Sequence, residues 1–290
     1  MNYIFIVNPT SGDSKGLEAG KIIEAYCKEK KINYKVIYTS KEKEAITLTS
    51  RYKNMPNTII YSVGGDGTLN EVVTGLVGGS AKLDVIPVGS GNDSYKSLKN
   101  IDNNKIDLGK VNDRYFINIA SFGIDAITAA KAEELKSTNL DNSKIYTKAL
   151  LSSFLTFKPI NLNINGVSKK ITILTICNGG YYGGGFNIYP NYNLNDGMFD
   201  ICEVDSVSKI RLLYLLSKLV KVRHVGRKEF QVYKDNNIHI SSNNKLCCNI
   251  DGEIITGNNF NISLINGAIT LNREDNIKII DVLKTKKLIK

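Results

Sequence analysis

The sequence predicts an α/β domain at the N-terminus followed by an all-β domain, a β-sandwich. Through roughly the first 110 residues, β-branched runs alternate with segments that carry apolar residues at helical spacing, which is typical of parallel βαβ units. From about Tyr115 the runs become short and strand-like, separated by turn signals such as Asn165-Gly166 and the glycines 183–185. A chain of 290 residues is long enough to bury two cores.

Four strands of a parallel sheet are expected in the first domain. They cover Tyr3 to Asn8, Tyr34 to Thr39, Asn57 to Val63 and Leu83 to Val88. Helices are expected in the gaps, because the chain must cross back between parallel strands. In the third gap the apolar stripe that faces the sheet is formed by Leu69, Val72, Val73 and Leu76.

Helical stretches are also expected beyond the first domain. Roughly 124–157 and 208–222 interrupt the β-rich part, and 276–290 regains helical character. A lone terminal helix would hide little apolar surface, so we expect the last stretch to pack back on the first domain. The predicted α/β domain therefore comprises 1–115 with about 274–290, and the β-sandwich domain comprises 116–273.

Composition excludes several classes of protein. No apolar run approaches the roughly 20 residues that cross a bilayer, and the first residues lack a positive segment typical of a signal peptide, so we expect a cytoplasmic protein. Five cysteines without C-x-x-C spacing indicate reduced thiols rather than disulfides or zinc. A net charge of +10 favours an anionic partner. Nucleic acid is disfavoured, because no zinc-finger spacing or aromatic RNA-binding motif occurs.

The segment YSVGGDGTLNEVVTGL predicts a phosphate site. Gly64, Gly65 and Gly67 let backbone N–H groups converge on an anion at the start of the following helix. An aspartate in their midst, Asp66, makes sense if Mg²⁺ or its water shell lies between the carboxylate and the phosphates. The alternative is a tight turn in which Asp66 is only the N-cap of the helix.

Two further corners follow strands of the same sheet, in VNPTSGDSKG and PVGSGND. Because the carboxyl ends of adjacent parallel strands form the ligand crevice of open α/β sheets, the three corners are expected to converge. Their hydroxyl, amide and N–H donors come from Asn8, Thr10, Ser11, Gly12, Ser90, Gly91, Asn92 and Asp93. The alternative is three ordinary βα turns.

These motifs, with NLNDGMFD and a late DGE in this order, resemble the soluble bacterial lipid kinases of the diacylglycerol kinase catalytic-domain family. The resemblance covers nearly the whole chain, although GGDGT alone is shared with the related NAD kinases. It implies a two-lobed fold with ATP in the cleft and transfer of the γ-phosphoryl to a lipid hydroxyl. The nucleotide contacts that it implies are Asn8, Pro9, Thr10, Ser11, Gly12, Thr39, Gly64, Gly65, Asp66, Gly67, Thr68, Leu69, Asn70, Glu71, Ser90, Asn92 and Asp93.

The resemblance also implies that carboxylates hold Mg²⁺ through water and accept a proton. The water-linked network would consist of Asp66, Asp93 and Glu253. A lipid alcohol needs a base, for which Asp251 and Glu253 are the candidates. They lie two residues apart, so they share a face of a regular strand unless Gly252 makes a turn, and the sequence does not decide which is the base.

A second, structural Mg²⁺ is implied in NLNDGMFD. Its ligands would be the Asp196 side chain and the backbone oxygens of Asn193 and Met198. The alternative is a turn with no metal.

The stretch from Lys209 to Lys228 carries seven Lys or Arg residues and no acid, interleaved with leucines. It predicts a surface that meets anionic lipid, and the alternative is a packed domain helix with solvated lysines. We therefore predict an ATP- and Mg²⁺-dependent diacylglycerol kinase at the inner face of the membrane, and a homodimer is left open. The alternatives are a kinase for another lipid alcohol such as a sphingoid base or ceramide, an NAD kinase, and a lipid-binding regulator without activity.

Overall fold

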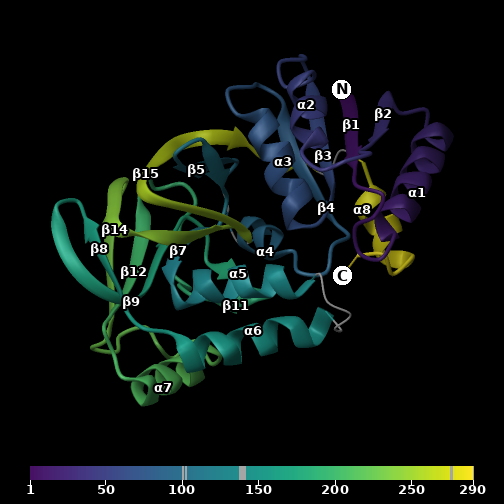
Figure 1. Cartoon of the computed structure of the whole chain (residues 1–290). Coiled ribbons are helices and arrows are strands. Elements are labelled where there is room, and N and C mark those ends of the chain that lie inside the picture. The colour runs from purple at the N-terminus through teal and green to yellow at the C-terminus, as the bar shows by residue number, and fades with distance from the viewer. Residues whose placement is uncertain (100, 102, 137–141, 275–276, 290) are drawn as a thin grey trace. The chain divides into compact units, whose positions relative to one another are not determined.

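The computed structural model describes the chain except for residues 100, 102, 137–141, 275–276 and 290 (Figure 1). It divides into two compact units, Met1–Leu108 with Asn266–Lys290, and Gly109–Ile265. Strands β5 (Lys105–Val111) and β15 (Glu253–Thr270) run from one unit into the other. No helix among the described residues is long and apolar enough to span a membrane.

The first unit contains a four-stranded parallel sheet in the order β2-β1-β3-β4. Its strands are β1 (Asn2–Val7), β2 (Tyr34–Tyr38), β3 (Thr58–Gly64) and β4 (Lys82–Pro87). The helices are α1 (Lys15–Glu29), α2 (Glu44–Ser50), α3 (Asp66–Leu76), α4 (Asp93–Lys99) and α8 (Ile279–Thr285). Strands alternate with helices through this unit, as the sequence predicts, so the α/β fold is confirmed.

The sheet is covered on both faces, which explains why β1 and β3 are almost continuously apolar. Alternate residues of these strands, such as Phe5 and Tyr61, pack against α1 and α8, while α2 and α3 contact β1 and β3. Ile279 and Leu283 of α8 are fully buried in the same cluster as Ile23 of α1. The expectation that the C-terminal segment packs back on the first domain is therefore confirmed.

The second unit is β-rich. Its strands beyond β5 and β15 are β6 (Arg114–Phe116), β7 (Ile119–Gly123), β8 (Ile160–Ile164), β9 (Val167–Cys177), β10 (Tyr181–Tyr182), β11 (Phe186–Asn187), β12 (Phe199–Asp205), β13 (Phe230–Asp235) and β14 (Asn237–Ile250). The main sheet has the order β13-β12-β9-β7-β14-β15-β5-β6, with β8 pairing with β14 and β9. Its described pairings are antiparallel, as between β12 and β13 and between β14 and β15.

The helices of this unit are α5 (Ile124–Lys136), α6 (Asn142–Thr156) and α7 (Lys209–Leu219). The predicted stretch 124–157 therefore contains α5 and α6, and residues 137–141 between them lie outside the described part. One core cluster, with Phe122, Phe199 and Phe260, is built from strands, whereas a second cluster lies between the sheet and the helices. Ser208 caps α7, since its hydroxyl accepts the N–H of Arg211 at 3.3 Å.

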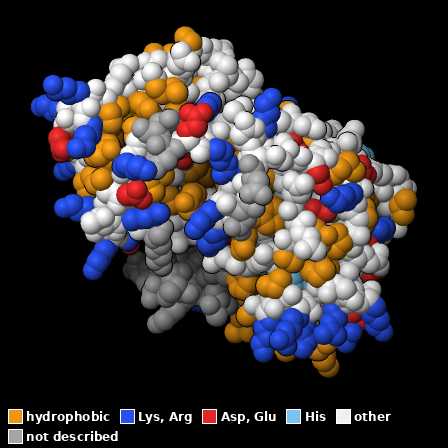
Figure 2. Space-filling model, turned by 180° about the vertical axis from the view of Figure 1, so that it is seen from behind, with side chains coloured by type: hydrophobic (Ala, Val, Ile, Leu, Met, Phe, Trp, Pro, Cys, Tyr) orange, Lys and Arg blue, Asp and Glu red, His pale blue; other side chains and the backbone are white. Residues whose placement is uncertain are grey.

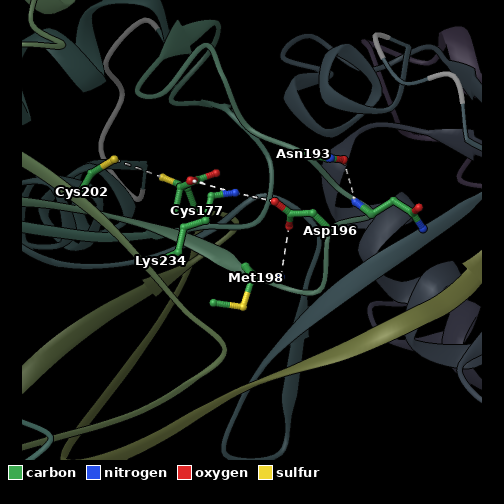
Figure 3. A network of polar contacts seen from close by, with 8 residues as sticks. Cys177, Asn193, Asp196, Met198, Cys202 and Lys234 are labelled. Carbon is green, nitrogen blue, oxygen red and sulfur yellow. Dashed lines mark hydrogen bonds and ion pairs between the residues drawn. The ribbon is translucent and has the colours of Figure 1, made fainter.

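All five cysteines are free thiols, and the four other than the half-buried Cys247 are buried. Cys177 and Cys202 come from paired strands, and their sulfur atoms lie 3.9 Å apart (Figure 3). Burial raises the pKa of the Cys177 thiol well above its ordinary value. The Cys177 thiol is therefore protonated at neutral pH, and the buried cysteines pack as small apolar side chains.

Candidate functional site

The loops that follow β1, β3 and β4 meet at one edge of the parallel sheet. A Cβ atom on Gly12, whose φ is +59°, would lie 2.0 Å from the carbonyl oxygen of Val88. One on Gly89 would lie 2.4 Å from the Cα atom of Gly65. These approaches leave no room for a side chain, so the glycines let the backbones of the three corners touch. The convergence expected from the strand order is present in the first unit.

Gly67 differs from the glycines around it. A Cβ atom on Gly64 would lie 2.4 Å from the hydroxyl oxygen of Thr68, so packing alone requires that glycine. Gly67 is exposed in the first turn of α3, and a Cβ atom there would meet no heavy atom within 4 Å. Neither packing nor a positive φ demands glycine at this position. The space over the turn is open beside backbone N–H groups that have no partner within their own helix.

A cavity of about 400 Å³ lies beside this turn, at the ends of β1 and β2. It is lined by Asn8, Pro9, Thr10, Thr39, Ser40, Lys41, Glu42, Ala45, Thr68 and Glu71. Six of these residues are nucleotide contacts implied by the sequence motifs. Ser40, Lys41, Glu42 and Ala45 belong to no motif. The signal that could have found the first three is their position just after β2 at the same edge of the sheet, whereas Ala45 lies in the first turn of α2.

The side chain of Asn8 joins two of the corners. Its amide nitrogen donates to the Thr68 hydroxyl at 3.2 Å, and its carbonyl oxygen accepts the Thr10 N–H at 3.1 Å and the Thr10 hydroxyl at 2.9 Å. The N–H of Ser11 in turn donates to the backbone carbonyl of Asn8 at 3.3 Å. The loop after β1 is therefore held in a fixed shape against the start of α3.

Two of the implied contacts have structural partners. The Glu71 carboxylate accepts the backbone N–H groups of Lys43 at 2.9 Å and Ala45 at 3.2 Å, so it holds the start of α2 from its place on α3. Leu69 is only 2% exposed and its side chain belongs to the packed face of α3, so a contact of Leu69 with the nucleotide would come from its backbone. Its neighbour Asn70 is half-buried on the same helix.

Asp66 is the first residue of α3, and the N-cap is Gly65, so the alternative that Asp66 caps this helix is wrong. Its Oδ1 atom instead accepts the N–H of Ser94, in the first turn of α4, at 2.8 Å. Within the described residues, Oδ2 has no hydrogen-bond partner and faces Gly91. One carboxylate oxygen therefore joins the corner after β3 to the corner after β4, and the other is available to a ligand.

The corner after β4 is shaped by Asn92, whose φ is +54°. Its side chain donates to the backbone carbonyl of Gly89 at 2.7 Å, while Ser90 between them is exposed. Asp93 is buried and forms an ion pair with Lys96 at 2.9 Å. No cluster of three or more His, Cys, Asp or Glu side chains able to hold a metal ion occurs in the described part of the chain.

In the second unit, Asp251 and Gly252 form the tight turn between β14 and β15, with φ values of +48° and +101°. The sequence left a shared strand face and a turn open for Asp251 and Glu253, and the structure shows the turn. The Asp251 carboxylate accepts three consecutive backbone N–H groups, from Ile117 at 2.6 Å, Asn118 at 3.0 Å and Ile119 at 2.9 Å. These three hydrogen bonds hold the carboxylate in one orientation.

Glu253 is held differently. It is the first residue of β15, its side chain is 54% exposed, and its Oε2 atom forms an ion pair with Arg114 at 2.6 Å. Its Oε1 atom has no partner among the described residues. Glu253 is therefore the more mobile of the two carboxylates that the DGE motif supplies.

The NLNDGMFD loop contains the three residues expected to hold a structural Mg²⁺ (Figure 3). The side chain of Asp196 accepts the N–H of Met198 at 3.1 Å, and that of Asn193 accepts the N–H of Asn195 at 3.0 Å. The other oxygen of Asp196 is bonded to the ammonium of Lys234, which also lies 3.6 Å from Asp200. The hydrogen bond to Asp196 raises the pKa of Lys234, so this side chain is charged.

The Lys234 ammonium stands where a divalent cation would contact Asp196. Two cations cannot share one carboxylate oxygen at hydrogen-bond distance without strong repulsion. The residues therefore do not fit the expected Mg²⁺ unless Lys234 moves away. Asp200, which pairs with Lys234 from inside the unit, is nearly fully buried, and this burial raises its pKa to about 6.

Comparison with known proteins gives one consistent family. Residues 2–117 match the diacylglycerol kinase catalytic domain, and residues 118–273 match the YegS C-terminal NAD kinase beta sandwich-like domain. The chain is 30% identical over 218 residues to a diacylglycerol kinase of Bacillus subtilis, covering 67% of this chain and 71% of that protein. It is 29% identical over 270 residues to a diacylglycerol kinase of Staphylococcus haemolyticus, covering 86% and 81% respectively.

Solved structures agree in fold. A Bacillus anthracis diacylglycerol kinase superposes with a TM-score of 0.63 at 18% identity, covering 94% of this chain and 97% of that one. Another structure from the same organism gives a TM-score of 0.72 at 21% identity, covering 94% and 95%. The order of motifs, the α/β and β-rich parts and the two family domains all agree, so this chain belongs to the diacylglycerol kinase family of lipid kinases.

Proposed function

We propose that the protein transfers the γ-phosphoryl group of MgATP to the hydroxyl of diacylglycerol and releases phosphatidic acid, at the cytoplasmic face of an anionic membrane. The observation that carries the proposal is the open turn at Gly67, beside a cavity lined by six residues of the nucleotide motifs. A glycine that the protein itself does not require, at the start of a helix, leaves room for a phosphate group.

The residues around this turn have distinct tasks. In this proposal the first N–H groups of α3 bind the triphosphate. The hydrogen bonds of Asn8 with Thr68 and Thr10 hold the loop after β1, which lines the cavity. Glu71 acts through α2, whose start it holds next to the cavity, rather than through the ligand. Lys41 supplies a side-chain cation to the lining.

Mg²⁺, when bound with the nucleotide, would neutralise charge on the phosphate oxygens and hold them in place. The unpartnered Oδ2 atom of Asp66 is suited to accept a hydrogen bond from a metal-bound water. For Asp93 and Glu253, a place in the same water-linked Mg²⁺ network stays a prediction. The structural Mg²⁺ at Asn193, Asp196 and Met198 is not part of this proposal, since Lys234 occupies the carboxylate.

Asp251 is the better placed of the two candidate bases. Three backbone amides hold its carboxylate in one position. This suits a base, which must lie within hydrogen-bond reach of the substrate hydroxyl whose proton it takes. Because both oxygens already accept backbone N–H groups, a substrate hydroxyl would reach the carboxylate where one of these bonds opens. Its second contact with Asn118, at 3.3 Å, is the longest of them.

Other acceptors fit the family as well. None of the described residues identifies the acyl chain of the substrate, so a sphingoid base or a ceramide-like alcohol is an alternative substrate. The alternative that is not an enzyme is a lipid-binding regulator without activity. An NAD kinase is disfavoured by the family match over residues 2–117.

The test is incubation with radiolabelled ATP and a panel of lipid alcohols in mixed micelles, with NAD and water as further acceptors. We expect labelled phosphatidic acid from diacylglycerol and a dependence on Mg²⁺. Label on NAD alone, or no acceptor-dependent label at all, would refute the proposal. Label on another lipid alcohol in preference to diacylglycerol would refute the substrate but not the reaction.

A further inference from the structure

Helix α7 exposes an apolar stripe. Its inward residues Leu212 and Leu215 are buried against the core of the second unit. On the other side, Ile210 is 84% exposed and Leu213 is 59% exposed, and Val220 just after the helix is 66% exposed. Positions 210, 213 and 220 follow helical spacing, so they form one stripe that no described residue covers. Large apolar side chains exposed together mark a surface that meets another apolar phase.

Cations gather beside this stripe around one aromatic ring. The guanidinium of Arg211 lies 4.7 Å from the centre of the Tyr214 ring, the ammonium of Lys218 lies 5.0 Å from it, and Arg227 lies 5.7 Å from it. The only described carboxylate bonded to any of the three is Glu229, which pairs with Arg211. Lys218 and Arg227 therefore remain available to an external anion beside the same ring.

The stripe continues toward α6. Leu151 and Leu155, one turn apart on α6, are 60% and 62% exposed. The ammonium of Lys209, the first residue of α7, donates to the backbone carbonyl of Leu155, which places the end of α6 beside the start of α7. In Figure 2 this part of the molecule shows Lys and Arg side chains gathered beside hydrophobic ones.

We infer that this α7 surface, formed by Ile210, Leu213 and Val220 with Arg211, Lys218 and Arg227, docks the protein on a bilayer that contains anionic phospholipid. The apolar stripe enters the boundary between head groups and acyl chains, and the cations around Tyr214 contact head-group phosphates. The choice of a bilayer rather than a protein partner rests on the apolar stripe lying next to Lys218 and Arg227, which have no carboxylate partner among the described residues. The inference deepens the proposed function, since it names the surface that brings the enzyme to its substrate.

The test is flotation of the full chain with vesicles of phosphatidylcholine and phosphatidylglycerol (1:1) and with vesicles of phosphatidylcholine alone. We expect the wild type to prefer the anionic vesicles. The double variant Ile210→Ser with Leu213→Ser is expected to bind both kinds at least tenfold more weakly. The double variant Lys218→Glu with Arg227→Glu is expected to lose the preference for phosphatidylglycerol.

Two control variants change similar residues elsewhere in the same unit. Val167, 57% exposed on β9, is replaced by Ser, and the exposed Lys245 on β14 is replaced by Glu. Both are expected to bind vesicles like the wild type, and circular dichroism with thermal melting checks that all variants are folded. Unchanged vesicle binding by the α7 variants, an equal loss in the control variants, or no binding by the wild type would overturn the inference.

Kinase activity is measured separately, with a short-chain diacylglycerol that is dispersed below its critical micelle concentration. We expect the α7 variants to keep wild-type turnover of this dissolved substrate while they lose activity on vesicles. If the wild type binds vesicles but phosphorylates no lipid alcohol, the proposed function is refuted and the inference about the docking surface still holds. Loss of turnover on the dissolved substrate as well would assign α7 to the structure of the active site and overturn the inference.

Discussion

Replacement of Gly67 by Ala tests the phosphate site, because the structure predicts opposite effects on stability and on nucleotide affinity. The added methyl group would meet no heavy atom within 4 Å and requires no change of backbone. Alanine also costs less conformational entropy than glycine within a helix, so the variant should gain about 0.5–1 kcal/mol of stability. For a chain of this size that gain corresponds to an increase in Tm of roughly 2 °C.

The same methyl group would stand in the space proposed for the triphosphate. A misplaced or weakened set of phosphate contacts costs about 1.4–2.8 kcal/mol, which is a ten- to hundredfold rise in the KM for ATP. The assay is steady-state kinetics with varied ATP at saturating lipid, together with differential scanning calorimetry of the protein alone. If Gly67 had only a structural role, its replacement would lower the stability and the activity of the protein together.

Two matched replacements of glycine by alanine serve as controls. Gly64→Ala would place its methyl group 2.4 Å from the Thr68 hydroxyl, so it should lose about 1–3 kcal/mol of stability. Gly257→Ala, on β15, would have its nearest contact at 3.5 Å and should leave the KM unchanged. An unaltered KM for ATP in a folded Gly67→Ala protein would refute the assignment of this turn to the triphosphate.

Three other changes are expected to give distinct results. Asp125→Asn removes a buried carboxyl whose burial raises its pKa to about 6 from 3.8. The wild type should therefore lose about 2 kcal/mol of stability relative to the variant as pH rises from 4 to 7, because the folded carboxyl holds its proton more strongly than the unfolded one. Urea unfolding across that range checks this, and a difference independent of pH would contradict it. Lys234→Met leaves the Asp196 carboxylate without its cation and should lower the free energy of unfolding by about 1 kcal/mol. We expect millimolar Mg²⁺ to restore this stability in the variant and to leave the wild type unchanged. Melting curves with and without Mg²⁺ check this. Asp251→Asn should lower kcat by about 10²-fold or more with little change in the KM for ATP, whereas Glu253→Gln should lower it less; the reverse order would exchange the two roles.

The fold was largely predictable from the sequence because its signals are local. The apolar spacing of Leu69 to Leu76 fixes α3 and the glycines before it fix the turn, and both lie within one short segment. The Asn165-Gly166 pair likewise gives the turn between β8 and β9, with both residues at positive φ. The corners after β1, β3 and β4 meet because these strands are neighbours in the parallel sheet, and parallel neighbours end at the same edge.

The partners of the site residues were not predictable, because they come from elsewhere in the chain or from backbone atoms. Glu71 looks like a ligand contact in its motif, yet its carboxylate holds N–H groups 26 and 28 residues upstream. Asp196 looks like a metal ligand, yet it is bonded to Lys234 38 residues downstream. No spacing rule relates such pairs, since only the folded sheet places them together. A motif therefore predicts which residues belong to the site more reliably than it predicts the atoms that each of them contacts.

The chain has a net charge of +10, and its cations are distributed differently at the two proposed anion-binding surfaces. Among the described residues that line the cavity at the ends of β1 and β2, Lys41 is the one cation, beside the carboxylates of Glu42 and Glu71 and several hydroxyl and amide side chains. Such groups bind a phosphate chain by fixed geometry, which suits a nucleotide that must be held in line for transfer. Around α7 the cations are long, exposed side chains beside an apolar stripe, which suits a fluid surface whose head groups have no fixed positions. If this division is correct, added salt should weaken vesicle binding far more than it raises the KM for ATP, because exposed charges are screened and hydrogen bonds to backbone N–H groups are not.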